Sequence, residues 1–136
     1  MKHLILIIAS LLGIYACADS IVPRTLDDVE SYIMERPDSA LAVLESMDRS
    51  LLVTEADRAH HALLNAMALD KSFIDVSDDS LARVAVDYYS KRGDRRYYAR
   101  ALYYLGVAYY NQGEYNKAIV IYTKAEKMAE GVDSQY

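Results

Sequence analysis

The stretch of sequence that decides the fold runs from residue 99 to residue 129 and reads Ala-Arg-Ala-Leu-Tyr-Tyr-Leu-Gly-Val-Ala-Tyr-Tyr-Asn-Gln-Gly-Glu-Tyr-Asn-Lys-Ala-Ile-Val-Ile-Tyr-Thr-Lys-Ala-Glu-Lys-Met-Ala. Its apolar side chains recur at helical spacing on both sides of Gly113, which predicts two helices joined by a tight turn. Gly106 and Ala118 are expected to let the two helix backbones approach. Tyr109 and Tyr122 are expected to fill the gap between them.

This spacing resembles the tetratricopeptide (TPR) repeat, a helix-turn-helix unit that stacks with copies of itself. The residues that carry the resemblance are Leu105, Gly106, Tyr109, Gly113, Ala118, Tyr122 and Ala125. Leu102 stands where the family prefers Trp, and Glu130 stands where it has a closing Pro. The resemblance implies a non-catalytic scaffold that binds other polypeptides.

Helical periodicity dominates the chain after residue 24, and strand-like alternation is absent from that part of the sequence. We therefore expect an all-α, TPR-like α-α superhelix over residues 25–131. Its three helical hairpins are predicted at about 25–48, 55–91 and 95–129, with a short tail at 132–136. The connection at 72–79 is longer than the repeat normally uses.

The first sixteen residues, an apolar run after Lys2 and His3, fit a signal peptide that is too short to span a membrane. Residues 14–17 resemble a bacterial lipobox, in which cleavage precedes Cys17 and its thiol receives a lipid. Ordinary signal cleavage after Ala18 is the alternative. Cys17 is the single cysteine of the chain and has no disulfide partner, which favours the lipid. Residues 17–24 would then form a linker to the anchor.

These features predict an exported lipoprotein, anchored in the membrane of a bacterial cell envelope, with a soluble secreted or periplasmic protein as the alternative. Without residues 1–16 the chain has 15 − 1 = 14 basic and 20 acidic side chains, a formal charge of −6. Nucleic acid is therefore not an expected partner. Acidic side chains concentrate in residues 17–87, which either orients an approaching partner or merely solvates helix faces.

The concave face of a TPR array is lined chiefly by the first helix of each hairpin, so the resemblance implies where a partner would bind. On the last hairpin this face would carry Arg100, Tyr103, Val107, Tyr110 and Asn111. On the second hairpin it would include His60 and Met67. Tyrosine and arginine often dominate binding energy at interfaces. The alternative is that the tyrosines at positions 103 and 110 pack against a neighbouring hairpin.

No catalytic, metal or cofactor site is expected. His60 and His61 are adjacent and therefore diverge on a helix, and no cysteine is available to complete a zinc site. Residues 75–79 lack the glycine and the distal Glu of a calcium loop and are better explained as helix caps. The basic segment 91–96 contains an Arg-Gly-Asp tripeptide, which the end of one helix and the start of the next explain more simply.

The sequence thus predicts a scaffold that mediates protein–protein interaction and does not act as an enzyme. One alternative is an N-terminal input or anchoring fragment of a longer TPR regulatory or envelope protein. Another is a non-catalytic accessory subunit of a surface complex. No helix after residue 129 is expected to cover the last hairpin. Self-association through this uncovered face is therefore a further hypothesis.

Overall fold

The computed structural model describes residues 21–132, and this range is helical without a strand. The elements are an N-terminal helix that covers residues 21–32 of the described range, α2 Pro37–Ser46, a 3₁₀ turn η1 Arg49–Leu51, α3 Glu55–Lys71, α4 Ser80–Tyr89, α5 Arg95–Asn111 and α6 Tyr115–Ala129. The predicted all-α, TPR-like architecture is confirmed.

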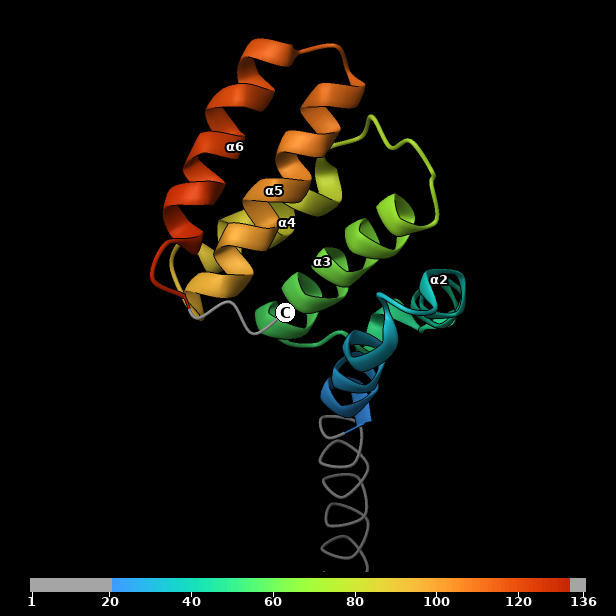
Figure 1. Cartoon of the computed structure of the whole chain (residues 1–136). Helices are drawn as coiled ribbons and strands as arrows, with labels where there is room; N and C mark the ends of the chain where they lie inside the picture. The colour runs from blue at the N-terminus through green and yellow to red at the C-terminus, as the bar shows by residue number, and fades with distance from the viewer. Residues whose placement is uncertain (1–20, 133–136) are drawn as a thin grey trace, which may run out of the picture.

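Successive helices pack against one another, and α3 also contacts α5 directly. In Figure 1, α5 and α6 lie side by side at one end of the molecule, while the N-terminal helix and α2 lie at the other. Helices α3 and α4 connect the two ends. The first helix of each hairpin therefore lies near the next first helix, as in a stacked helical array.

The core is built mainly from leucine and alanine. Its fully buried large side chains are Leu26, Val29, Ile33, Leu44, Leu63, Leu64 and Leu102. Eleven of the buried positions in residues 21–132 are alanine, and these small side chains let neighbouring helices pack closely. Leu102, which stands where the family prefers Trp, is only 1% exposed, so leucine fills that position without leaving it open to solvent.

The N-terminal helix includes residues 21–24, which the sequence pattern placed in a linker. Val22 is 2% exposed and belongs to the core, so apolar burial extends the packed domain toward the N-terminus. The predicted signal peptide and Cys17 lie outside the described residues. Among the helices of residues 21–132, none is long and apolar enough to cross a membrane.

Polar caps set the starts of the two long helices. Thr54 and Asp57 form a capping box at α3, in which each side chain accepts a hydrogen bond from the other residue's backbone N–H. Asp94 accepts from the backbone N–H of Arg96 at the start of α5. At α4 the carboxylate that caps is that of Asp78, which accepts from the N–H of Ser80.

Helix α2 begins without a capping side chain. Asp38 and Ser39 are residue types that favour the N-cap, but the helix already begins at Pro37, and Arg36 at the N-cap position makes no side-chain capping hydrogen bond. Proline suits the first helical position because the N–H it lacks would have no partner within the helix.

The close contact in the last hairpin differs from the expected one. A Cβ on Gly106 would lie 2.5 Å from Cε1 of Tyr122, so this glycine makes room for the tyrosine ring. Ala118 is buried, as expected. The hydroxyl of Tyr109 accepts a hydrogen bond from Arg83 of α4 at 2.7 Å, and Nζ of Lys117 of α6 lies over the Tyr109 ring, 5.7 Å from its centroid, so Tyr109 contacts both neighbouring helices.

Candidate functional site

A groove of about 570 Å³ lies between the N-terminal helix, α3 and α5, which are the first helices of the three hairpins. Its lining residues are Asp27, Glu30, Ser31, Ile33, Met34, Met67, Lys71, Arg96, Tyr97, Arg100, Tyr103 and Tyr104. Aromatic rings and methionines form much of the lining of this groove, and charged side chains form most of the rest. Three of the residues that the sequence assigned to the concave face, Met67, Arg100 and Tyr103, lie here together.

The carboxylate of Glu30 connects the three helices that line the groove. Nε2 of His60 donates to Oε2 of Glu30 at 2.9 Å, and the hydroxyl of Tyr97 donates to the same oxygen at 2.8 Å. Nη1 of Arg100 donates to the other oxygen, Oε1, at 2.6 Å. One side chain of the first hairpin is thereby bonded to the second and third hairpins. We call these four residues the Glu30 cluster.

The electrostatics of the cluster favour an ionised Glu30. Burial alone would raise its pKa, but the hydrogen bonds from His60, Tyr97 and Arg100 outweigh burial and lower the pKa to about 2. Burial and the bond to Glu30 raise the pKa of Tyr97, so its hydroxyl keeps the proton that it donates. The cluster therefore fixes one negative charge among three donors.

Local sequence explains why the donors converge. Helices α3 and α5 both have 17 residues and both begin after a capping side chain. His60 is the sixth residue of α3, and Arg100 is the sixth residue of α5. Residues at the same place in two helices of equal length and similar packing point to the same side. His60 and Arg100 therefore both point to the first hairpin and bond to Glu30.

Tyrosine rings extend the cluster into an aromatic wall. Tyr97 stacks on Tyr89 of α4, with ring centroids 5.2 Å apart, and meets the ring of His60 edge-on at 5.5 Å. Tyr103 lies against Tyr104 and Tyr122 but remains 44% exposed. An aromatic side chain that is supported on two sides and open on the third is suited to contact a bound chain.

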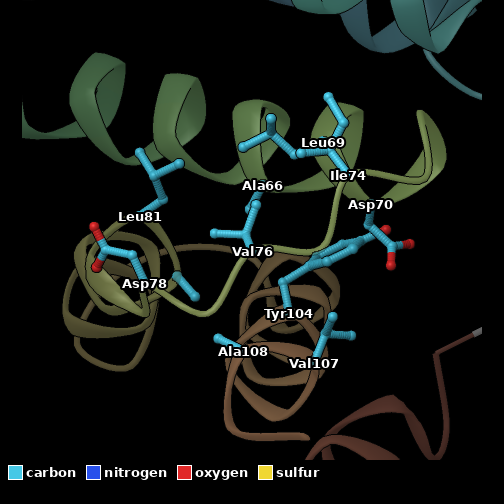
Figure 2. Close-up of a pocket in the computed structure, with 11 residues that line it drawn as sticks. Ala66, Leu69, Asp70, Ile74, Val76, Asp78, Leu81, Tyr104, Val107 and Ala108 are labelled. Carbon is cyan, nitrogen blue, oxygen red and sulfur yellow. The ribbon is translucent and has the colours of Figure 1, made fainter. Parts of the chain in front are cut away.

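The remaining predicted groove residues lie elsewhere. Val107 lines a separate small cavity beneath the 72–79 connection, together with Val76 and Ala108 (Figure 2). At about 20 Å³ this cavity has room for roughly one water molecule and not for a ligand. In Figure 2, Val76 projects between the side chains of α3 and those of α5.

Asn111 and Tyr110 do not face the groove in this structure. The amide of Asn111 donates to the backbone oxygen of Val76 at 3.1 Å, so it holds the 72–79 connection in place. The ring of Tyr110 meets that of Tyr115 edge-on at 5.2 Å, which is a contact within the last hairpin. For these two positions the structure corrects the predicted groove assignment, because the groove ends before the last turn of α5.

Sequence reasoning missed Glu30 and Tyr97. Glu30 follows Val29, a member of the buried stripe of the N-terminal helix, so it lies at the edge of an apolar face. That position indicates a helix-packing neighbour but not which one. The partners of Glu30 are 30, 67 and 70 residues away, so only the tertiary structure could identify them.

The two histidines have different surroundings. Nε2–H of His61 donates to the backbone oxygen of Leu44 at 2.9 Å and so joins α3 to α2. Burial lowers the pKa of His61, which favours its neutral form. Within residues 21–132, no three His, Cys, Asp or Glu side chains are grouped closely enough to hold a metal ion.

Comparison of the chain with curated proteins and with solved structures gives no significant match. Residues 99–131 match the family described as Tetratricopeptide repeat. This range contains most of α5, all of α6 and the turn between them. Repeats of this family are typically non-catalytic and bind protein partners. Residues 99–131 thus match a single tetratricopeptide repeat, and the helical architecture of residues 21–132 is a TPR-like α-α superhelix.

Proposed function

We propose that this protein is a scaffold that holds a polypeptide in the groove between its three first helices. The observation that carries the proposal is the Glu30 cluster, which ties all three hairpins together directly behind the aromatic wall. A groove that is already braced loses little conformational entropy when a partner binds.

The groove chemistry supports an extended chain with apolar side chains. Tyr103 and Met34 are exposed on opposite sides of the groove, from α5 and from the segment after the N-terminal helix. Arg100 already bonds to Glu30. The affinity for a bound polypeptide is therefore expected to come mainly from aromatic and methionine contacts. The charged groups of the lining are expected to restrict the orientation of that polypeptide.

Site-specific photo-crosslinking in the source cells tests this function. A photoreactive amino acid at Tyr103 is compared with one at Val120, which is 67% exposed on α6 and does not line the groove. We expect one polypeptide to be captured from position 103 and not from position 120. Equal capture at both positions, or none at position 103, would contradict the proposal.

We further propose that the scaffold is exported and attached to the membrane of the cell envelope through a lipid on Cys17. The support is the sequence alone: an apolar leader, a lipobox-like segment and a single cysteine at its end. Two or three acyl chains on one residue would anchor the protein firmly. Detergent-phase partitioning that disappears in Cys17→Ala is expected, and unchanged partitioning would refute the anchor.

A further inference from the structure

The end of α2 is bonded to a side chain of α3. His61 is 4% exposed, and its Nε2–H donates to the backbone oxygen of Leu44 at 2.9 Å. Leu44 lies in the last turn of α2, where carbonyl groups have no partner within their own helix. Among helices α2 to α6, the one that contacts α2 is α3. His61 therefore supplies a buried polar bond at the interface that holds α2 in the molecule.

This hydrogen bond defines the protonation state in which His61 fits its site. A carbonyl oxygen only accepts, so Nε2 carries the proton of the neutral ring and Nδ1 carries a lone pair. Within residues 21–132, Nδ1 has no hydrogen-bond partner. Protonation of the ring would place a second N–H at Nδ1, and a buried N–H without an acceptor costs free energy. The site therefore satisfies the neutral ring and not the charged one.

The charges around His61 also oppose protonation. Arg49 of η1 and His60 of the same helix are the charged groups that act on it, and both are basic. The acidic side chains of α2, Asp38 and Glu45, are exposed and are not among the groups that act on His61. Burial lowers the pKa of His61 below its ordinary 6.5, the hydrogen bond to the carbonyl opposes this shift, and the two basic groups increase it.

We infer that His61 is a pH-sensitive switch, which holds α2 on α3 in its neutral form and releases α2 when mild acid protonates the ring. Because the pKa is lowered in the packed form, the stabilisation is complete above pH 6.5. It is lost as the pH falls below that value, since the open form takes up the proton first. The switch acts on α2, which does not line the groove, and it requires no bound polypeptide.

The Glu30 cluster responds differently to the same change in pH. Glu30 keeps its charge until the pH approaches its pKa of about 2, and the hydroxyl of Tyr97 keeps its proton. His60 donates to Glu30 through Nε2, and a positive charge on its ring strengthens that bond. Acidification to pH 5 is therefore expected to release α2 while the N-terminal helix stays bonded to α3 and α5.

Hydrogen exchange of the full-length chain at pH 7 and pH 5 tests the switch, with each rate corrected for the intrinsic effect of pH on exchange. We expect the amide groups of residues 40–46 to lose protection at pH 5, while those of α5 and α6 keep theirs. His61→Gln should abolish this loss, because a glutamine amide still donates to the carbonyl of Leu44 and does not titrate. His60→Gln is the matched control at the adjacent position and should leave most of the loss in place.

Arg49→Gln is a second variant, and it leaves His61 unchanged. Removing this positive charge brings the pKa of His61 closer to its ordinary value, so α2 should lose less protection between pH 7 and pH 5. A merely structural role of His61 would not respond to a charge on η1. The ring of His61, followed by NMR, should take up its proton over the same pH range in which α2 loses protection.

Two results would overturn the switch. One is unchanged protection of α2 in the unmodified chain between pH 7 and pH 5. The other is an equal loss of protection in the unmodified chain and in a folded His61→Gln. If His61→Gln does not fold, an equal loss in Arg49→Gln and in the unmodified chain decides against the switch.

Discussion

Helices α3 and α5 are the most informative pair of regions in this molecule. They have the same length, a capping side chain at the same position, a groove donor at the sixth residue and the same hydrogen-bonded C-terminal motif. Only α5 lies in the segment that matches the family. The comparison teaches that a helix can keep the length, cap and C-terminal hydrogen bonds of α5 although Ala66 and Phe73 stand where α5 has Gly106 and Gly113.

The two helices lead into different connections. Gly113 leads directly into α6, whereas Phe73 leads into an irregular connection that ends at Asp79. Asn111 near the end of α5 holds that connection through the oxygen of Val76. The regular hairpin therefore supports the irregular one, and the residue after the C-cap of α3 is an exposed phenylalanine instead of a glycine.

The largest expected effect comes from Glu30, which bonds to matching positions of both helices. Glu30→Gln should lower the free energy of unfolding at pH 7 by about 2–3 kcal/mol, since a folded pKa of about 2 lies well below the reference 4.5. Because the folded pKa is depressed, this stability is present above pH 4.5 and is lost as the pH falls toward 2. Urea unfolding at several pH values measures the difference.

Removing the donors one at a time sharpens this test. Arg100→Leu should cost more than His60→Leu, because Arg100 supplies a permanent charge and the shortest bond of the cluster. Equal stability of Glu30→Gln and the unmodified chain at pH 7 would show that the cluster does not brace the hairpins.

A second pair of substitutions exchanges the residues at the twelfth position of each helix. Gly106→Ala places a Cβ against the ring of Tyr122 and should cost about 1–3 kcal/mol. Ala66→Gly in α3 should cost about 0.5–1 kcal/mol through helix propensity, and the loss of a methyl group that packs against the core should add to this cost. Thermal unfolding followed by circular dichroism measures both.

The double variant Gly106→Ala with Tyr122→Leu provides the control for this pair. If the clash with the ring is the cause, shortening the side chain at position 122 should recover part of the loss. Additive losses in the double variant would exclude that cause.

A third pair changes Phe73 (φ +58°) and Gly113 (φ +78°), which follow the C-caps of α3 and α5 in the left-handed conformation. Phe73→Gly should raise the free energy of unfolding by about 1 kcal/mol, and Gly113→Ala should lower it by about the same amount. A Cβ on Gly113 would meet no atom within 4 Å, so backbone conformation is the whole cost there. Equilibrium unfolding measures both changes, and opposite signs are the decisive result.

The smallest expected effects are at the helix starts. Thr54→Ala and Asp94→Ala each remove a side-chain acceptor and should cost about 0.5–1 kcal/mol. Hydrogen exchange should accelerate in the first turn of the altered helix only. Faster exchange throughout both helices would show that the caps control more than their own turns.

The sequence predicted much of this architecture because its information is local. Helical periodicity, the helix start within segment 91–96, where Asp94 is the cap, and the turn at Gly113 act within a few residues, and the structure contains them. The prediction that Arg100 and Tyr103 share a face also follows from spacing along one helix, and both line the groove. Their role in binding a partner stays a prediction.

The features that the sequence left open depend on contacts between distant residues. The Glu30 cluster joins three helices, and no spacing along the chain indicates that one carboxylate would face both His60 and Arg100. The positive φ of Phe73, by contrast, belongs to local hydrogen bonds from Phe73 and Ile74 to Asp70 and Leu69, but the glycine that usually marks this motif is replaced there by phenylalanine. Local periodicity alone determined the helices and their pairing, whereas tertiary packing decided which polar groups meet, because burial and hydrogen bonding depend on neighbours that only the folded chain brings together.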